Sequence, residues 1–290
     1  MIIVTGGDGF IGSNLIKRLS AFSDRVLSVD YSNHRKNREW IHSNDFLFAE
    51  EYLNKADVVF HNGAASSTTN RDPFDVMHKN FDYSVELLKR CLKYNIKLIY
   101  ASSASVYGDG PFYESSPKNP KNMYALSKSM FDDYSALFSE HLPQLTGLRY
   151  FNVYGRGEEY KKNMASVVYK FYHQHQQTGE VILFENSEHF LRDFVHIDDV
   201  LDITVDFYEN GHSGIYNVGS GLERSFADIA NIFVDRYGSK IKVVPMPEEL
   251  HGKYQKYTKS DNTRINQVCD SKRLTLEQGV HRYLDYLESK

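Results

Sequence analysis

Tyr124 and Lys128 are the residues of this chain whose types and spacing most directly suggest chemistry. Side chains four positions apart share one face of a helix. An ammonium beside a phenol favours the phenolate and lowers the phenol pKa from about 10. Ser103 stands upstream in the segment YASSASVYG, and its hydroxyl can help to hold a substrate carbinol. The expected chemistry is loss of a proton from that carbinol to Tyr124 while its carbon gives up a hydride.

A hydride acceptor is expected from the N-terminal segment TGGDGFIG, residues 5–12, which follows an apolar run and opens a helical pattern. Gly6, Gly9 and Gly12 allow a tight turn, close approach to a pyrophosphate and helix–strand packing. The helix N-terminus then offers N–H groups to the phosphates. Asp30 ends the next apolar run, where a carboxylate can accept hydrogen bonds from the adenosine ribose. Together these features predict a dinucleotide site.

The residues leave the choice between NAD and NADP open. Asp30 favours NAD because its carboxylate repels a 2′-phosphate. Arg35, Lys36 and Arg38 follow closely and can neutralise that phosphate, but a solvated basic loop explains them equally well. Small residues in the segment HNGAAS, residues 61–66, leave room for a flat ligand or serve close packing.

These residues need a scaffold that brings several strand ends together. Apolar runs occur at Ile2–Thr5, Val26–Asp30, Val58–His61, Leu98–Ser102 and Leu148–Asn152, and helical patterns begin near Ile11, Pro73 and Met123. A further strand and helix are expected over 194–209, and a short strand near 215–218. This alternation predicts an α/β fold with a doubly wound parallel sheet of the Rossmann type. Little chain separates Asp30 from Ala56, so the strand and helix there should be abbreviated.

The chain is expected to form two interleaved domains. After Gly155 the pattern loosens and becomes aromatic and basic. Residues 1–151 and 191–217 are predicted to form the dinucleotide-binding domain. Residues 152–190 and 218–290 are predicted to form a smaller substrate-binding domain.

Composition excludes several classes of protein. The 290 residues carry a net charge of −4, which argues against a nucleic-acid or polybasic membrane surface. The two cysteines, Cys91 and Cys269, form no zinc or disulfide pattern, which suits a reducing cytoplasm and predicts no metal site. No basic leader and no apolar run of about 20 residues are present, so a cytoplasmic protein without a membrane span is expected.

The glycine turn, Ser103 and the Tyr124/Lys128 pair resemble, in this order, the extended short-chain dehydrogenase/reductase superfamily. Its members mostly modify nucleotide-activated sugars, and the resemblance covers essentially the whole chain. It implies that Ser103 is the catalytic hydroxyl. Dehydratases of the superfamily follow this serine with Asp-Glu, whereas this chain has Ala104 and Ser105, so the resemblance favours epimerisation over dehydration.

The segments HNGAASSTT, RYFNVYG, NMASV, FENSEHFLRDFV and GKYQKYT resemble the ADP-L-glycero-D-manno-heptose 6-epimerases, which invert an exocyclic carbinol in the precursor of the lipopolysaccharide inner core. In that family a lysine after the FNVYG segment is a second acid/base, and the matching residue here is Lys161. Two such groups are needed because the planar ketone presents its other face before hydride returns, and its oxygen then meets a different proton donor. The alternative is that Lys161 is a solvated charge, as we expect for Lys162.

The same resemblance implies the remaining site residues and favours NADP, with NAD possible. Cofactor contacts are expected from Gly6, Gly9, Phe10, Ile11, Gly12, Asp30, Tyr31, Arg35, Asn62, Gly63, Ala64, Ala65, Ser66, Asn80, Tyr124, Lys128, Val153 and Lys161. Substrate contacts are expected from Ser66, Ser103, Asn152, Asn163, Lys170, Phe184, Glu185, Asn186, Ser187, Arg192 and Tyr254. Asn163 and Lys170 stand where the family has a small serine and a histidine.

Arg192 also makes independent sense, because a guanidinium suits a diphosphate. Its alternative is a surface salt bridge with Asp193. His196 is expected to pack or to cap a helix before Asp198. The expected partners are a nucleotide-diphosphate sugar and further copies of the chain, since related epimerases form homo-oligomers.

Two other functions fit the same motifs less well. One is a 4-epimerase or 4-reductase of a different nucleotide sugar. The other is a regulator that senses the cofactor without turnover, and such proteins tend to lack the tyrosine–lysine pair that this chain retains.

Overall fold

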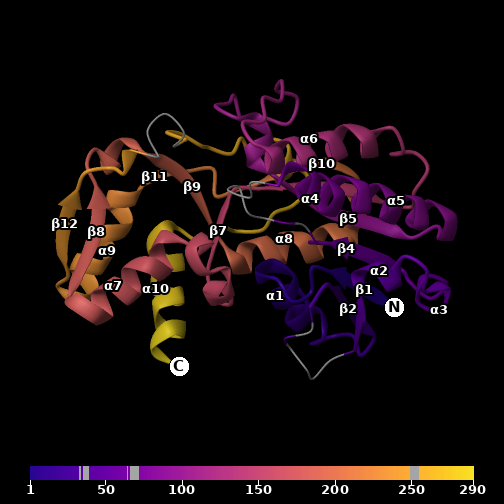
Figure 1. The fold of residues 1–290 in the computed structure, drawn as a ribbon, viewed down its shortest axis with the longest axis horizontal. Coiled ribbons are helices and arrows are strands. Elements are labelled where there is room, and N and C mark those ends of the chain that lie inside the picture. The colour runs from indigo at the N-terminus through magenta and orange to yellow at the C-terminus, as the bar shows by residue number, and fades with distance from the viewer. Residues whose placement is uncertain (33, 35–38, 64, 66–71, 249–254) are drawn as a thin grey trace.

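The computed structural model describes residues 1–32, 34, 39–63, 65, 72–248 and 255–290. Two lobes lie side by side in it (Figure 1). The larger lobe is built mostly from the indigo-to-magenta part of the chain, and the smaller lobe mostly from the orange and yellow part. Among the described residues, no helix combines the length and apolar character needed to cross a bilayer.

A seven-stranded sheet forms the larger lobe. It contains β1 (Ile2–Thr5), β2 (Val26–Asp30), β3 (Trp40–His42), β4 (Val58–His61), β5 (Lys97–Ser103), β6 (Leu145–Tyr150) and β10 (Gly214–Val218). The order is β10-β6-β5-β4-β1-β2-β3, and every neighbouring pair is parallel. The chain reverses its direction of travel across the sheet between β1 and β4, which is where doubly wound sheets bind ligands. The predicted fold class is confirmed.

The predicted strands at β1, β2 and β4 have the observed bounds, and β5 extends one residue further at each end. The strand predicted over 148–152 is wrong in its bounds, because β6 ends at Tyr150 and Asn152 begins β7 (Asn152–Tyr154) in a different sheet. The start of β6 at Leu145 was missed because Thr146 and Gly147 interrupt the apolar run. Gly147 is required there because a Cβ would lie 2.5 Å from the Tyr100 hydroxyl.

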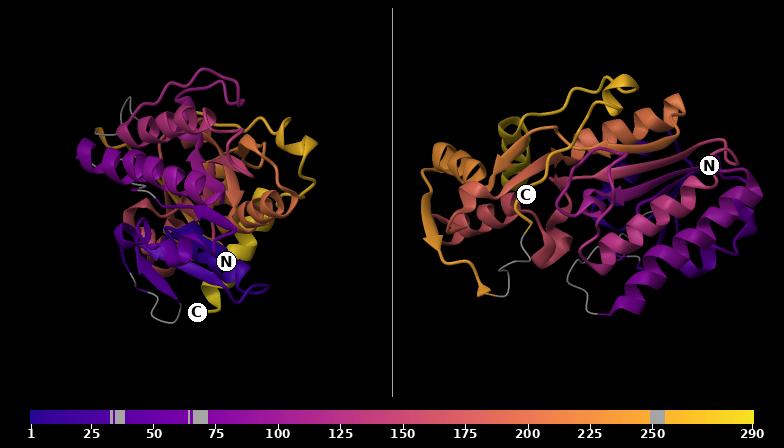
Figure 2. Two further views of the ribbon diagram at one scale, coloured as in Figure 1. Left: turned by 90° about the vertical axis from the view of Figure 1, so that its right-hand side faces the viewer. Right: turned by 90° about the horizontal axis from the view of Figure 1, so that it is seen from above.

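Helices cover both faces of this sheet, as shown on the right of Figure 2. On one face α1 (Phe10–Leu19) and α8 (Ile197–Asn210) share a buried cluster with Val4 of β1. On the other face α5 (Tyr83–Tyr94) and α6 (Met123–Ala136) share a cluster with Ile3. Successive side chains of a strand point to opposite faces, so β1 contributes to both cores.

The chain between β2 and β4 is abbreviated, as expected: β3 has three residues, and α2 (Ser43–Phe46) and α3 (Glu50–Leu53) have four each. The remaining short elements are α4 (Pro73–Met77), the π-helical turn η1 (His78–Asp82), and the 3₁₀ turns η2 (Ala104–Tyr107), η3 (Glu158–Met164), η4 (Ser187–His189) and η6 (Ile265–Gln267).

The smaller lobe has its own buried cluster. It contains the parallel pair β8 (Glu180–Phe184) and β12 (Lys240–Val244), and the helices α7 (Val167–Thr178), α9 (Phe226–Tyr237) and α10 (Leu276–Glu288). A three-stranded sheet of β11 (Glu223–Ser225), β9 (Leu191–His196) and β7 completes the fold. Successive side chains of β9 pack into different lobes: Phe194 lies in the core of the smaller lobe and Val195 in a core of the larger lobe. This strand therefore connects the two lobes.

Candidate active site

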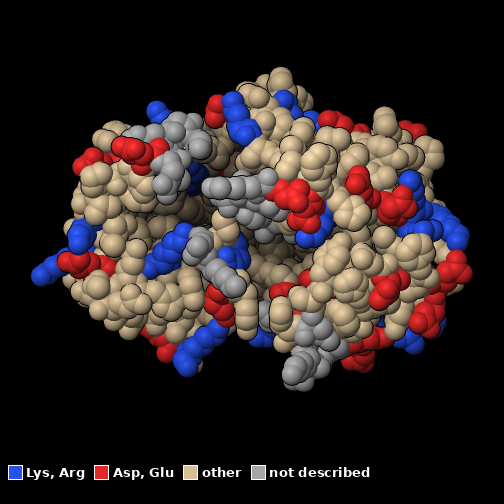
Figure 3. Space-filling view, in the orientation of Figure 1, with Lys and Arg blue, Asp and Glu red and all other residues tan. Residues whose placement is uncertain are grey.

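A cavity of about 740 Å³ lies at the carboxyl ends of β1, β4 and β5, and Figure 3 shows this face of the molecule hollowed between the two lobes. All four residues predicted to be catalytic, Ser103, Tyr124, Lys128 and Lys161, line it. Of the predicted cofactor residues, Gly6, Gly9, Phe10, Ile11, Gly12, Asp30, Tyr31, Asn62, Gly63, Ala65 and Val153 also line it. Arg35, Ala64 and Ser66 lie outside the described residues.

The glycine turn has the geometry of a phosphate cradle. Gly6 has φ +65°, and a Cβ on it would lie 2.6 Å from the backbone of Asn62. A Cβ on Gly12 would lie 2.1 Å from the Gly6 carbonyl oxygen, so neither position accepts a larger residue. Gly9 begins α1 without a side-chain cap, and the first turn carries no acidic residue. These residues fit the diphosphate of a dinucleotide, because the N–H groups at this helix end favour an anion.

Two carboxylates converge at the end of β2. Asp30 Oδ1 accepts hydrogen bonds from the backbone N–H groups of Tyr31 (2.7 Å) and Ser32 (3.4 Å), and its Oδ2 accepts from that of Asp8 (2.9 Å). Asp8 Oδ2 accepts in turn from the backbone N–H of His34 (2.6 Å). Asp8 was not predicted as a site residue, although an acidic residue inside the glycine turn was the available signal. Arg35, Lys36 and Arg38 fall outside the described residues.

A buried polar network holds the loop after β4 in place. His61 lies between the Thr5 hydroxyl, 2.6 Å from Nδ1, and the Ser84 hydroxyl, 2.8 Å from Nε2. Burial lowers the pKa of His61 to about 3, so the ring is neutral at physiological pH. Asn80 is 1 % exposed and accepts from the backbone N–H of Ala65 (2.7 Å). Asn80, predicted to touch the cofactor, is not among the residues that line the cavity, and its two hydrogen bonds to the backbone of Ala65 hold a residue that does line it.

The tyrosine, lysine and serine meet as predicted, since α6 presents Tyr124 and Lys128 towards the end of β5. Ser103 Oγ accepts from the hydroxyl (2.9 Å) and the backbone N–H (3.2 Å) of Ser105, and its side chain is hydrogen-bonded to Tyr124. Lys128 Nζ donates to the carbonyl of Ala101 (2.7 Å). These contacts fix three functional groups around one point of the cavity.

The electrostatics differ from the expected lowering of the tyrosine pKa by lysine. Burial raises the pKa of Tyr124, and the hydrogen bond with Ser103 opposes the rise. Burial lowers the pKa of Lys128 to about 8, against the opposing charge of Asp132 one helical turn away. Desolvation penalises both the phenolate and the ammonium, so it dominates at this depth. In the described structure, Tyr124 is therefore protonated at neutral pH, and its phenol can donate a proton.

Lys161, in the turn η3, points into the cavity. Its Nζ lies 5.0 Å from the centroid of the Phe10 ring. Burial lowers the pKa of Lys161, Glu158 opposes the change, and Lys170 adds to it. The Asn14 side chain of α1 secures the loop by donating to the Arg156 carbonyl (2.8 Å). The alternative of a fully solvated Lys161 is therefore excluded, whereas the side chains of Lys162 and Asn163 are outside the description.

The predicted substrate residues of the smaller lobe lie outside the cavity lining. They are Asn152 in β7, Lys170 in α7, Phe184, Glu185, Asn186 and Ser187 between β8 and η4, and Arg192 in β9. Arg192 is 5 % exposed, donates to the Leu191 carbonyl (3.0 Å) and stacks on the Phe226 ring. Asp193 is fully buried, so a surface salt bridge between the two is excluded. Tyr254 is not among the described residues.

His196 is a capping residue, as expected. Its Nδ1 accepts from the backbone N–H of Asp198 (3.2 Å) at the start of α8. Across the described ranges, no group of three or more histidine, cysteine or acidic residues is placed to hold a metal ion.

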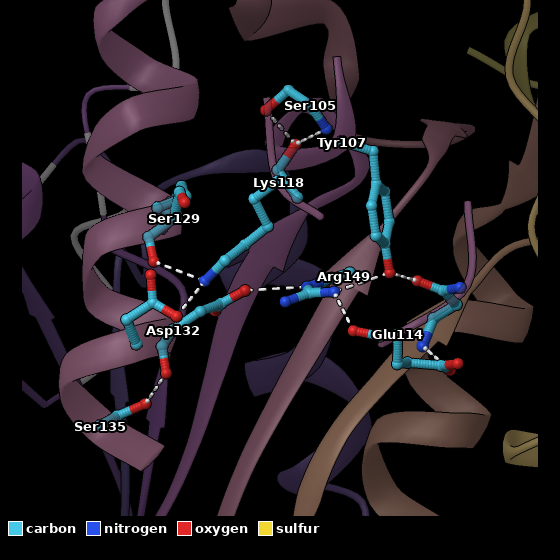
Figure 4. A network of polar contacts seen from close by, with 12 residues as sticks. Ser105, Tyr107, Glu114, Lys118, Ser129, Asp132, Ser135 and Arg149 are labelled. Carbon is cyan, nitrogen blue, oxygen red and sulfur yellow. Dashed lines mark hydrogen bonds and ion pairs between the residues drawn. The ribbon is translucent and has the colours of Figure 1, made fainter. Parts of the chain in front are cut away.

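The sequence did not predict a buried ion pair between Arg149 and Asp132, which lies one helical turn after Lys128 (Figure 4). Arg149 of β6 donates from Nε to Asp132 of α6 (2.8 Å) and from Nη1 to the Tyr107 hydroxyl (2.8 Å) and the Glu114 carbonyl (3.1 Å). The Arg149 and Asp132 side chains are 2 % and 0 % exposed. The pair ties the catalytic helix to the sheet.

The sequence model described as "NAD dependent epimerase/dehydratase family" matches residues 2–219. The chain belongs to the NAD-dependent epimerase/dehydratase family. This membership agrees with the resemblance inferred from the glycine turn and the Tyr124/Lys128 pair, and with the geometry of the cavity.

Individual members of this family are similar to the chain along its whole length. It is 42% identical to an ADP-L-glycero-D-manno-heptose-6-epimerase of Brachyspira hyodysenteriae, over 99% of this chain and 98% of that protein. Among solved structures, the ADP-L-glycero-D-manno-heptose-6-epimerase of Helicobacter pylori is 32% identical, with a TM-score of 0.88 over 100% of this chain and 96% of that one. UDP-glucose 4-epimerase of Thermotoga maritima, solved with UDP-glucose, is 26% identical, with a TM-score of 0.85 over 99% and 98% of the two chains.

Proposed function

We propose that this protein inverts an exocyclic carbinol of a nucleotide-activated sugar, and that the sugar is ADP-glycero-manno-heptose, inverted at C6 for the lipopolysaccharide inner core. The observation that carries the proposal is the presence of two acid/base groups, Tyr124 and Lys161, in one cavity beside the glycine turn. Similarity to the two heptose epimerases supports the choice of sugar.

The chain's residues divide the work between the two orientations of the ketone. A bound nicotinamide would take the hydride from the carbinol carbon and return it to the opposite face. In one orientation Tyr124 exchanges the proton of the sugar oxygen, with Ser103 holding that oxygen by a hydrogen bond. After the ketone presents its other face, Lys161 exchanges the proton instead. Lys128 orients the site through its bond to the Ala101 carbonyl.

The test is inversion followed by NMR, with purified protein and a panel of nucleotide sugars. We expect the 6-epimers of ADP-glycero-manno-heptose to interconvert and UDP-glucose to remain unchanged. Inversion of UDP-glucose at C4, with none of the heptose, would overturn the assignment. Stoichiometric consumption of added cofactor would identify a reductase instead, since epimerisation leaves the cofactor unchanged.

We further propose that the charges at the adenosine end favour NAD, whereas the family resemblance favours NADP. The preference for NAD is supported by the Asp8 and Asp30 carboxylates at the end of β2, whose negative charges would repel a 2′-phosphate bound beside them. Asp8→Asn should therefore improve NADP binding more than NAD binding.

The opposing basic cluster of Arg35, Lys36 and Arg38 is tested by replacing all three residues with Ala. If the cluster binds the 2′-phosphate, NADP binding should fall more than about tenfold with NAD unaffected, since one charge-assisted contact contributes about 1.5–3 kcal/mol. Equal losses for both cofactors would show that it does not.

The domain division belongs to the same proposal. Residues 1–151 and 191–217 would bind the cofactor, and residues 152–190 and 218–290 would hold the sugar nucleotide, with Arg192 on its diphosphate. The protein would act as a homo-oligomer.

A further inference from the structure

Glu158 is a fully buried acidic residue in the turn η3 that the proposed chemistry has not used. One carboxylate oxygen accepts from the Ser166 hydroxyl (2.6 Å) and the Gly155 backbone N–H (3.4 Å), and the other accepts from the Ser166 backbone N–H (2.7 Å). Gly155 precedes η3 and Ser166 caps α7. A single carboxylate therefore closes the loop that carries Lys161.

All three donors to this carboxylate are neutral. A buried charge usually has a counter-charge, because desolvation without one is costly. Among the described residues, the cation whose charge lowers the pKa of Glu158 most is Lys161, three positions along the same turn. The other titratable groups that interact with Glu158 are the phenols of Tyr154, Tyr169 and Tyr283. None of these phenols adds a positive charge.

The charge of Lys161 is set by opposing influences. Burial favours its neutral form, and the positive charge of Lys170 on α7 acts in the same direction. Glu158 acts in the opposite direction and raises the pKa of Lys161. An acid/base that donates a proton in one direction and accepts it in the other must reach both forms near the working pH. Without Glu158, burial and the charge of Lys170 would both favour the neutral form of Lys161 with no carboxylate to oppose them.

We propose that Glu158 is a positioning residue that closes the 155–166 loop and keeps Lys161 available in its charged form as the second acid/base. The inference rests on the function proposed above and adds the residue on which that function depends. Glu158 touches neither the cavity nor a reacting atom. Its effect passes entirely through Lys161.

The first test measures the protonation of Lys161 directly and does not require the enzyme to turn over a substrate. The rate at which acetic anhydride acetylates Lys161 is measured by peptide mass spectrometry as a function of pH, in the protein with its bound dinucleotide. Only the neutral amine reacts, so the midpoint reports its protonation. Glu158→Gln should move the midpoint down by about one pH unit, because a nearby opposite charge typically shifts a pKa by 1–3 units. Lys170→Gln should move it up.

Two variants separate charge from folding. Glu159→Gln is the matched control, since Glu159 adjoins Glu158 in the chain but its carboxylate pairs with Lys290, so the midpoint should stay unchanged. Glu158→Asp keeps the charge on a shorter side chain and should restore most of the shift. An unchanged midpoint in folded Glu158→Gln protein would overturn the proposal, as would an equal shift in Glu159→Gln.

The second measurement distinguishes failure of this inference from failure of the proposed function. Inversion by Glu158→Gln should lose its activity at high pH about one unit earlier than wild type. If the wild type inverts no sugar while the acetylation midpoint still moves, the function is wrong and the role of Glu158 in charging Lys161 stands. If the wild type inverts the sugar and neither profile moves, the inference about Glu158 is wrong.

Discussion

Replacing Asp132 with Asn should destabilise the fold far more than the same change at its neighbour Asp133. The Asp132 side chain is fully buried and paired with the buried Arg149 at 2.8 Å. Breaking a buried pair from one side leaves an uncompensated charge, which typically costs about 3–5 kcal/mol. Asp133 is 71% exposed and paired with Lys118, and a surface pair contributes at most about 1 kcal/mol.

The assay is urea unfolding followed by circular dichroism, with both variants and wild type at the same pH. We expect Asp132→Asn to lower the free energy of unfolding by about 3–5 kcal/mol. Asp133→Asn should stay within about 1 kcal/mol of wild type. The double variant Asp132→Asn/Arg149→Met should be less destabilised than the sum of the two single variants, because the unpaired charge is then gone.

Equal stability of the two asparagine variants would refute the reasoning that desolvation governs this pair. Strict additivity in the double variant would refute the idea that the two side chains act as a unit. In either case the network of Figure 4 would be peripheral to the stability of α6, the helix that carries Tyr124 and Lys128.

Two further predictions follow from the cavity. Gly12→Ala should abolish dinucleotide retention through purification, measured by releasing the cofactor with denaturant, because its Cβ would lie 2.1 Å from the Gly6 carbonyl oxygen. Gly179→Ala is the control, since it adds backbone strain at φ +70° after α7 but meets no atom and does not line the cavity, so it should retain cofactor. Burial lowers the pKa of Lys128 from 10.5 to about 8 in the folded protein, so between these pH values the unfolded chain holds a proton that the folded chain has lost. The contribution of Lys128 to the free energy of unfolding should therefore rise with pH from about 8 to 10.5, and Lys128→Met should remove that slope in urea titrations. A slope that persists in Lys128→Met would assign it to another group.

The sequence predicted the fold where short-range patterns decide it. β1, β2 and β4 are short, mostly apolar runs that are almost entirely buried, so their bounds could be assigned without a structure. The end of β6 could not be assigned in this way, because Tyr150 and Phe151 continue the apolar pattern while the chain crosses into another sheet. Crossing between sheets leaves no local mark in the residues.

The site shows the same limit. Tyr124 and Lys128 were found because their spacing on one helix is a local feature, and Lys161 was found by resemblance. Asp132 and Arg149 are separated by the loop between α6 and β6, so only the folded chain brings them together. The direction of the Tyr124 pKa shift could not be predicted, because it depends on burial, which outweighs the hydrogen bond with Ser103.

The central claim is that Tyr124 and Lys161 each serve one orientation of the ketone. It is tested most directly by single-turnover reduction of bound cofactor, followed by absorbance, with each separate epimer of the sugar. Tyr124→Phe and Lys161→Met should each lose inversion by about 10²–10⁴-fold, the usual cost of removing a positioned acid/base. Each variant should still reduce the cofactor with one epimer, and the two variants should prefer opposite epimers. Near-normal inversion by Lys161→Met, or the same epimer preference in both variants, would contradict the account.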